Sequence, residues 1–169
     1  SNFLFGVILS KKGLPIHRET LKSQYQSYDE YIAALEIKID IHGALPIEYS
    51  RIAELTQRTN KCTNGRRYTV TEIKERIVRK NIKLYSISVS DRFSDLGLVG
   101  VLEVEDDTLT LFVYLAALGR KIEDKLLEFV VEKHQIYKIV FESTGKNEDI
   151  KPILAQAFPN AALTNPENR

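Results

Sequence analysis

Hydrophobic and polar residues alternate most strictly between residues 36 and 41, where Ile37, Ile39 and Ile41 lie on one face. A period of two residues is typical of a strand with one buried face, so this segment predicts the first strand. The early part of 96–105 is apolar on both faces, as in a central strand. Further strands are predicted at 83–89, 96–105, 108–115 and 138–141, with a tight turn at Asp106 and Asp107.

Apolar residues at the helical period predict an amphipathic helix over 121–133, where Ile122, Leu126, Phe129 and Val130 follow the i, i+4, i+7, i+8 spacing. Earlier helices are predicted at about 28–35, from Pro46 to about 59, and from about 70 onward.

Short polar motifs predict where the helices begin and end. Ser27 and Thr69 each precede a glutamate by three residues, which is the capping-box pattern of a helix start. Asn60 is a plausible terminator for the helix before it, and Asn147 is expected to cap a last helix ending near 157.

The predicted order along the chain is strand, helix, helix, three strands, helix, strand and helix, after one short helix. We interpret residues 1–26, with Gly6, Gly13 and Pro15 as breakers, as a connector from a missing N-terminal domain. The main domain is expected over 27–160, and a polar, frayed tail over 161–169.

Composition narrows the classes of function. A chain of 169 residues is long enough for one well-buried domain. The formal charge of +1 argues against nucleic-acid or membrane-surface binding, both of which need a concentrated positive field. No apolar run approaches the length of a membrane span. The single cysteine, Cys62, fits a reducing, cytoplasmic compartment, and the three histidines are too dispersed to predict a metal site.

Two unusual blocks carry a family resemblance. One is the segment 91–100, Asp-Arg-Phe-Ser-Asp-Leu-Gly-Leu-Val-Gly, and the other joins 55–60 to 66–69. Together they resemble the C-terminal region of the FkbH-like proteins, which act with acyl-carrier proteins in polyketide or polysaccharide biosynthesis. The resemblance covers about 27–158 and implies a covalently linked phosphatase-like domain, whose Asp-x-Asp motif this chain lacks, and an acyl-carrier protein as partner.

The order of elements also resembles the GNAT (acyl-CoA N-acyltransferase-like) superfamily, which implies an α/β fold with a mixed, largely antiparallel sheet flanked by helices. In such a domain the fourth strand splays from the fifth, and the gap holds the pantetheine arm of coenzyme A or acetyl-coenzyme A. The resemblance therefore places the arm against Val113 and Leu115. The phosphates would meet Leu118, Gly119, Arg120 and Lys121 at a helix start, where unpaired amides favour anions. The alternative is a plain strand-to-helix turn.

Two departures from the GNAT pattern bear on catalysis. Ala116 stands where the loop arginine or glutamine is usual, and Ile153 stands where a proton-donating tyrosine is common in the last helix. We therefore expect one of two functions. The first is an acyltransferase-like domain that binds coenzyme A or a carrier-bound phosphopantetheine arm and assists acyl or glyceryl transfer. The second is a non-catalytic module that docks an acyl-carrier protein.

The catalytic residue is unknown from sequence, and Asp91 and Asn60 are weak candidates. Asp91 is either a base or a polar anchor for the acceptor substrate, or part of a turn in which it pairs with Arg92. The turn is favoured, because most charged pairs at turns are structural. Asn60 either contacts a ligand or ends a helix. Arg66 and Arg67 either grip a phosphate or an acidic carrier protein, or are solvated.

Overall fold

A computed structural model describes residues 27–166, so the predicted connector at 1–26 lies outside the described residues. The helices are α3 (Tyr28–Ala34), α4 (Tyr49–Arg58), α5 (Val70–Ile77), α6 (Arg120–Lys133) and α7 (Ile150–Ala157), with single 3-10 turns at Pro46–Glu48 and Ala116–Leu118. The strands are β1 (Lys38–Gly43), β2 (Ile82–Ser90), β3 (Asp95–Glu105), β4 (Thr108–Tyr114), β5 (Lys138–Val140) and β6 (Ala162–Thr164).

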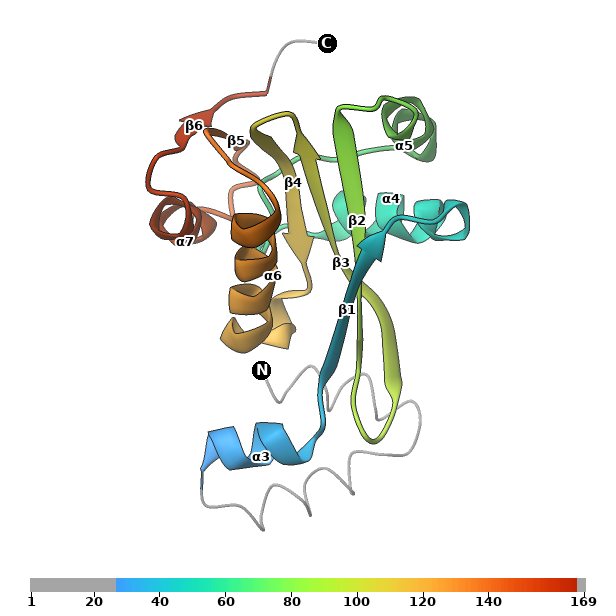
Figure 1. Ribbon diagram of the computed structural model, residues 1–169, viewed down its shortest axis with the longest axis vertical. Coiled ribbons are helices and arrows are strands. Elements are labelled where there is room, and N and C mark those ends of the chain that lie inside the picture. The colour runs from blue at the N-terminus through green and yellow to red at the C-terminus, as the bar shows by residue number, and fades with distance from the viewer. Residues whose placement is uncertain (1–26, 167–169) are drawn as a thin grey trace.

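The described strands form one six-stranded sheet in the order β1-β2-β3-β4-β5-β6 (Figure 1). The first four strands pair antiparallel with their neighbours along the chain. β5 and β6 add to that sheet in parallel, and α6 and α7 make the two crossovers that parallel pairing requires. The predicted fold class, an α/β GNAT-like fold with a mixed, largely antiparallel sheet flanked by helices, is confirmed.

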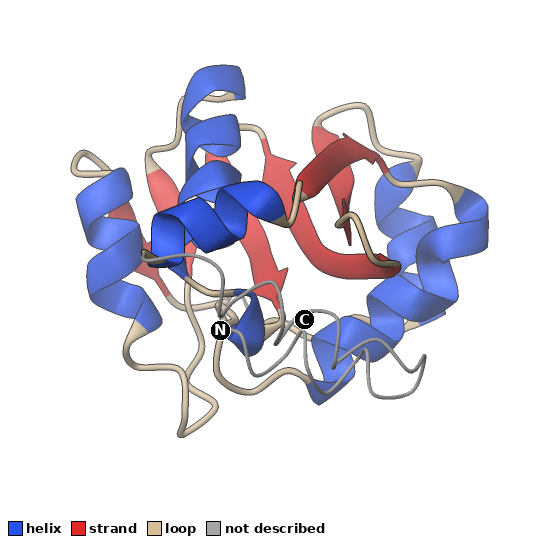
Figure 2. Ribbon diagram, turned by 90° about the horizontal axis from the view of Figure 1, so that it is seen from below, coloured by secondary structure: helices blue, strands red, loops and turns tan. Residues whose placement is uncertain are grey.

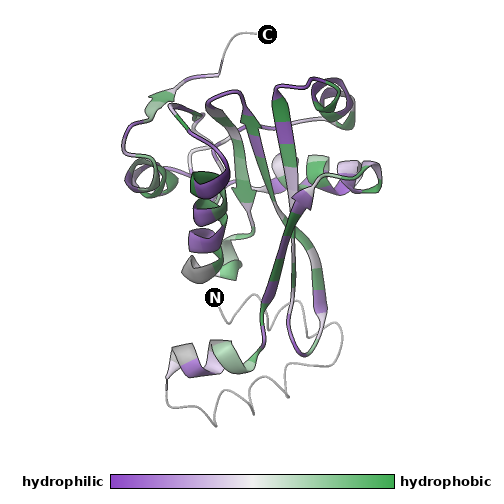
Figure 3. Cartoon of the chain, in the orientation of Figure 1, coloured by the Kyte–Doolittle hydropathy of each residue, from purple (hydrophilic) through white to green (hydrophobic). Residues whose placement is uncertain are grey.

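Helices lie on both sides of the sheet and create two hydrophobic cores (Figure 2). On one face, α4 and α5 cover β2, β3 and β4, and the buried residues include Ile52, Ile73 and Val113. On the other face, α6 and α7 cover a larger core that includes Leu126 and Leu154. Figure 3 shows the pattern behind this layering, since the central strands are mostly hydrophobic whereas the helices alternate along their length.

Thr69 and Ser27 cap the helix starts that the sequence predicts, and Thr69 makes both bonds of its capping box. The Thr69 hydroxyl accepts from the Glu72 amide at 3.1 Å, and the Glu72 carboxylate accepts from the Thr69 amide at 3.2 Å, which opens α5. The Ser27 hydroxyl accepts from the Glu30 amide at 3.1 Å at the start of α3. These contacts satisfy amides that have no partner within the helix.

Three local predictions are wrong. The C-cap of α4 is Thr59, not Asn60, because the backbone already becomes extended at Thr59; the Asn60 side chain accepts from Arg67 at 2.7 Å. Asn147 is fully buried and bonds to loop carbonyls, and the N-cap of α7 is Asp149. Residues 162–164, predicted to lie in a frayed polar tail, form β6, because parallel pairing with β5 anchors their backbone.

The feature that sets up the functional site is a splay between β4 and β5. These strands pair only through Thr108 with Lys138 and Leu109 with Ile139. Beyond that point β4 runs on to Tyr114 while β5 stops at Val140. A wedge therefore opens toward the end of β4, as the GNAT resemblance implies.

Candidate functional site

The wedge between β4 and β5 is filled by the chain itself. The loop between α4 and α5, residues 59–69, enters it and runs antiparallel to β4, with an isolated bridge between Thr63 and Val113. The Cys62 carbonyl accepts from the Tyr114 amide at 3.0 Å, and the Asn64 amide donates to the Phe112 carbonyl at 2.9 Å. Backbone groups on the free edge of β4 thus have partners within the chain.

Asn64 joins the two splayed strands across the wedge. Its Nδ2 donates to the carbonyls of Thr110 and Val140, both at 2.9 Å, and its Oδ1 accepts from the Phe112 amide at 2.9 Å. The side chain is fully buried, so no water replaces these bonds. A planar amide with donors on one side and an acceptor on the other suits this position, because it satisfies groups on both strands at once.

The next residue explains why the loop can pass so closely. Gly65 has a φ of +93°, and a Cβ there would lie 1.8 Å from the Glu142 carbonyl oxygen. Only glycine combines that conformation with so close an approach. Asn147 secures the same passage, because its Nδ2 donates to the carbonyls of Thr63 and Glu142, both at 3.0 Å.

Residues 62–65, called the plug from here on, occupy the place where the resemblance puts the pantetheine arm of coenzyme A. Their contacts therefore show whether that arm would fit. A pantetheine arm lying along β4 would need the edge groups that Cys62 and Asn64 already satisfy. Breaking those buried bonds would cost about 1–3 kcal/mol for each group left unpaired. The residues present therefore do not fit an arm along the β4 edge, and any ligand must bind outside the plug.

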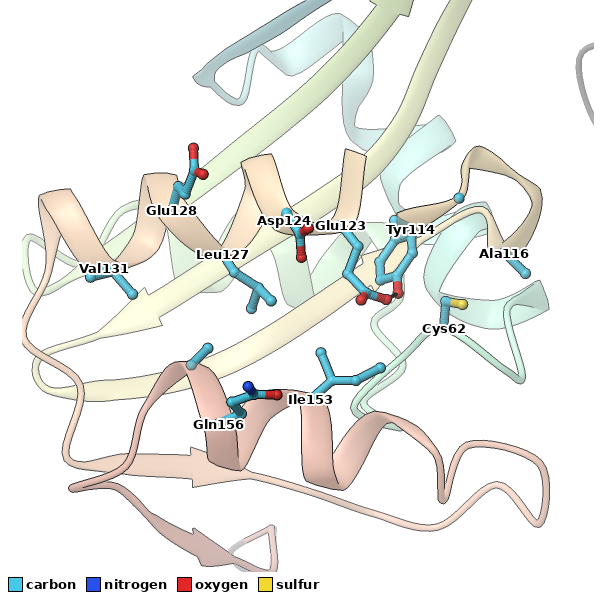
Figure 4. Close-up of a pocket in the computed structure, with 12 residues that line it drawn as sticks. Cys62, Tyr114, Ala116, Glu123, Asp124, Leu127, Glu128, Val131, Ile153 and Gln156 are labelled. Atoms are coloured by element: carbon cyan, nitrogen blue, oxygen red, sulfur yellow. Dashed lines mark hydrogen bonds between the residues drawn. The ribbon is translucent and has the colours of Figure 1, made fainter. Parts of the chain in front are cut away.

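Outside the plug lies a cleft of about 670 Å³ between α6 and α7 (Figure 4). Leu127 and Val131 of α6 lie across the cleft from Ile153 of α7, and Ala157 also lines the cleft, so one part of the wall is apolar. The other lining residues come from the α4–α5 loop, from the end of β4 and the turn after it, and from α6 and α7; they are Cys62, Tyr114, Ala116, Gly119, Glu123, Asp124, Glu128 and Gln156.

A tyrosine–carboxylate pair lies at the end of this cleft where α6 begins. The Tyr114 hydroxyl donates to the Glu123 carboxylate, and Figure 4 shows both groups beside Cys62. Burial raises the pKa of Glu123, and the neighbouring Asp124 raises it further. Burial, and then the charge of Glu123, raises the pKa of the Cys62 thiol to about 11. Cys62 is therefore protonated at neutral pH and is a poor nucleophile.

The electrostatics of the cleft are unusual for a phosphate site. Gly119, with a φ of +83°, is the N-cap of α6, and no side chain caps the helix. Its first-turn amides are therefore oriented as an anion site requires. However, Glu123, Asp124 and Glu128 all line the cleft, and no lysine or arginine with a described side chain does. Three carboxylates oppose a multiply charged phosphate group.

The structure separates the residues that the sequence predicted to bind a cofactor. Gly119 lines the cleft, and the backbone of Arg120 and Lys121 forms the first turn of α6 beside it. Leu115 is half-buried. Val113 is fully buried in the α4–α5 core, and Leu118 is 4% exposed within the other core, so a ligand in the cleft would not contact the Val113 side chain.

Neither weak catalytic candidate lies at the cleft. Asp91 is in the turn of the long β2–β3 hairpin, whose tip lies apart from α6 and α7 in Figure 1. Its carboxylate accepts from the amides of Phe93 and Ser94 at 2.8 and 3.0 Å, which is the structural turn interpretation. Asn60 accepts from Arg67, as described above.

Arg66 and Arg67 do not form the exposed basic patch that carrier docking was expected to use. Arg67 completes the end of α4, because its Nη1 donates to the carbonyls of Thr56, Gln57 and Thr59 at 2.9, 2.6 and 3.2 Å. Arg66 is only 9% exposed, and its guanidinium contacts Tyr68 and none of the carbonyls that bind Arg67. Because it is buried, Arg66 is not a solvated surface residue either, which was the other expectation for these two arginines.

Within residues 27–166, no cluster of three or more histidine, cysteine or acidic side chains could hold a metal ion. No helix in the same range is long and apolar enough to cross a membrane.

Comparison with known proteins finds likeness only among solved structures. No protein-family model and no curated protein matches the chain. A mutant of spermidine N-acetyltransferase SpeG from Vibrio cholerae is similar over 56% of this chain and 60% of its own, with 13% identity and a TM-score of 0.39. A chimera of that enzyme with hSSAT is similar over 60% of this chain and 68% of its own, with 12% identity and a TM-score of 0.38. An acetyltransferase of Trypanosoma brucei is similar over 78% of this chain and 98% of its own, with 15% identity and a TM-score of 0.42.

At these identities and TM-scores the likeness carries no argument about activity. The chain spans 60% of the length of the first of these acetyltransferases. The GNAT-like fold class rests on the strand order, the parallel β4–β5 pairing and the splay described above.

Sequence reasoning missed the residues that define the site. The sequence indicates only a loop between the predicted helices here, and the adjacent Asn64 and Gly65 are the available signal for a special backbone conformation. Tyr114 and Glu123 were not recognised as a pair, because they meet only when β4 and α6 fold against each other.

Proposed function

We propose that this chain is an acyltransferase-like domain whose α6–α7 cleft binds the phosphopantetheine arm of an acyl-carrier protein. The observation that carries the proposal is the cleft itself, which runs along α6 from its uncapped start, where Tyr114, Glu123 and Cys62 lie, to Val131. Its apolar wall suits the dimethyl group of the arm, and its carboxylates suit the arm's amide donors.

The charge of the cleft favours a carrier-bound arm over free coenzyme A. A carrier-bound arm has one phosphodiester, whereas coenzyme A adds a diphosphate and a further phosphate. Each additional negative charge near Glu123, Asp124 or Glu128 costs about 1–4 kcal/mol at a separation of ~4 Å. The first-turn amides of α6 would offset a single charge more readily than several.

The residues available for catalysis differ from those of the GNAT pattern. Ile153 lines the cleft at the place expected for a tyrosine and has no proton to donate. Tyr114 would supply a hydroxyl from β4 instead, oriented by Glu123. Glu123, whose pKa is raised by burial and by Asp124, would accept a proton from an incoming nucleophile. The FkbH-like setting, with a linked phosphatase-like domain, belongs to the same proposal.

An NMR titration of the whole chain tests the binding step. Phosphopantetheine, coenzyme A and acetyl-coenzyme A would each be added while the amides of residues 118–121 and 123 are followed. We expect saturable shifts with phosphopantetheine and weaker binding of coenzyme A. The absence of shifts with all three ligands would refute the proposal.

A matched pair of variants tests the charge argument. Asp124→Asn removes a carboxylate from the cleft, and Glu132→Gln removes one from an exposed position of the same helix that does not line the cleft. Asp124→Asn should strengthen coenzyme A binding about tenfold and phosphopantetheine binding less, since ~1.4 kcal/mol corresponds to a factor of ten. Equal effects of the two substitutions would mean that the charges in the cleft do not select the ligand.

The second candidate function is a non-catalytic module that docks an acyl-carrier protein. The observations that favour it are the apolar Ile153 and the raised pKa of the Cys62 thiol. A transfer assay with an acylated carrier protein separates the two functions. Loss of turnover in Tyr114→Phe with unchanged carrier binding supports catalysis, whereas binding without turnover in the unmodified chain supports docking alone.

A further inference from the structure

A second cavity, of about 660 Å³, lies beside α5 where β4 still pairs with β5. Its walls are mostly polar and include Glu75, Asp107, Thr110 and Lys138. Arg66 and Arg76 also line it. The cavity shares none of its lining residues with the α6–α7 cleft, so it is a separate site.

The wall of this cavity contains a buried network around one carboxylate. Glu103, 1% exposed, accepts from the Tyr68 hydroxyl at 2.8 Å and from the Thr110 hydroxyl at 2.7 Å. Arg76 donates to it through Nε and Nη2, at 3.1 and 2.8 Å. Arg76 therefore neutralises the charge of Glu103, and this part of the network is satisfied without Arg66.

Arg66 lies beside this network but has no carboxylate partner in it. Its Nη2 reaches the Tyr68 hydroxyl at 3.4 Å, and its guanidinium lies 5.4 Å from the centre of the Tyr68 ring. Its Nε is buried without a hydrogen-bond partner, and no described carboxylate forms an ion pair with it. A guanidinium that is 9% exposed and lacks a counter-ion is costly, because a buried charge needs a paired anion.

The surroundings of Arg66 define which anion would fit. A guanidinium presents two parallel donors, which match a carboxylate. The cavity is also lined by the carboxylates of Glu75, Asp106 and Asp107, which outnumber the one lysine of the lining, Lys138. These carboxylates would repel a doubly charged phosphate and attract an ammonium group.

We infer that this cavity binds a small zwitterion, with its carboxylate on Arg66 and its ammonium group toward the acidic residues of the wall. The inference does not depend on the proposed function, because it concerns different residues. It assigns a role to an arginine whose buried Nε has no hydrogen-bond partner in the described structure.

Calorimetric titration of the whole chain tests this inference with three probes: γ-aminobutyrate, butyrate and inorganic phosphate. We expect γ-aminobutyrate to bind most tightly, butyrate more weakly, and phosphate weakest. In the NMR spectrum, the guanidinium signal of Arg66 should shift on addition of γ-aminobutyrate. If none of the three probes binds at tens of millimolar, or if phosphate binds most tightly, the inference is wrong.

Two adjacent arginines provide matched variants. Arg66→Met keeps an unbranched chain but removes the charge, so affinity should fall at least tenfold while the melting temperature of the free protein holds or rises. Arg67→Met removes the bonds that end α4, so the melting temperature should fall while affinity is unchanged. Arg66→Lys keeps the charge without the planar fork and should lose affinity several-fold, which provides a test if Arg66→Met does not fold. Unchanged binding in Arg66→Met, or in Arg66→Lys if Arg66→Met does not fold, would overturn the inference.

Discussion

Replacing Asn64 by alanine should remove the plug between β4 and β5 and measurably destabilise the protein. The substitution deletes three side-chain hydrogen bonds, all at 2.9 Å, that join Thr110, Phe112 and Val140. It also leaves the Phe112 amide without that acceptor in the core. No other residue in this part of the chain replaces the amide, because Asn64 is fully buried between the strands.

The magnitude follows from the number of bonds. Each intramolecular hydrogen bond contributes about 0.5–1.5 kcal/mol, and a buried group left without a partner costs about 1–3 kcal/mol. The two lost bonds to carbonyls and the one orphaned amide together give a loss of about 2–6 kcal/mol in the free energy of unfolding. For a chain of this size, 1 kcal/mol corresponds to a melting-temperature shift of about 2–4 °C, so the midpoint should fall by roughly 4–24 °C.

Urea denaturation of Asn64→Ala and of Asn60→Ala provides the assay. Asn60 is exposed and makes one side-chain bond to Arg67, so its removal should cost less than about 1 kcal/mol. Asn64→Asp is a second test. It keeps the oxygen that accepts from the Phe112 amide, but it places a buried carboxylate oxygen against the carbonyls of Thr110 and Val140. Its folded-state pKa should rise, so this variant should lose stability as the pH rises. If Asn64→Ala costs no more than Asn60→Ala, the loop does not anchor the splay.

Three further predictions concern the loop and its surroundings. Gly65→Ala should abolish cooperative folding or lower the free energy of unfolding by more than about 4 kcal/mol. Gly97 also has a positive φ, of +75°, but has open space around it, so Gly97→Ala should lower the free energy of unfolding by only about 1–2 kcal/mol. Thermal melts of the two variants measure this difference. Burial lowers the pKa of His42, but its hydrogen bonds and ion pairs with Glu48 and Asp40 outweigh burial and raise the pKa above 6.5. These interactions therefore stabilise the fold fully below about pH 6.5 and lose their contribution as the pH rises through the folded-state pKa. The stability difference between wild type and His42→Asn should be larger at about pH 5.5 than at about pH 8.5. With a pKa of about 11, the Cys62 thiol should react with iodoacetamide at about pH 8 at least tenfold more slowly than free cysteine; an equal rate would show that the thiol is not buried beside Glu123.

Much of the fold could be predicted because its signals are local. The alternation around Ile39, the capping box at Thr69 and the stripe through Leu126 each involve residues within a few positions of one another. Such patterns specify an element without reference to the rest of the chain. The order of those elements then limited the fold to a mixed sheet with helices on both faces.

The site could not be predicted in the same way, because it depends on contacts between distant residues. Asn64 bonds to residues 46 and 76 positions away, and no local pattern indicates either partner. Likewise, β6 is too short to be recognised by alternation and exists because β5 supplies a partner edge. Asn147 has the composition of a helix cap but is drawn into the loop, where two carbonyls need a donor.

The α4–α5 loop links these observations. Cys62 lines the α6–α7 cleft, Asn64 fills the wedge, and Arg66 lines the second cavity beside α5. The loop therefore separates the two cavities and contributes a wall to each, so a ligand bound in one contacts a segment that shapes the other. Coupling between two sites requires that a ligand prefer one arrangement of the shared element. Because buried bonds at Asn64 and the close approach at Gly65 hold that element in one arrangement, we expect the two cavities to bind their ligands independently. Titrating phosphopantetheine in the presence and absence of saturating γ-aminobutyrate measures this directly, and a change in affinity of more than about threefold would show that the loop moves.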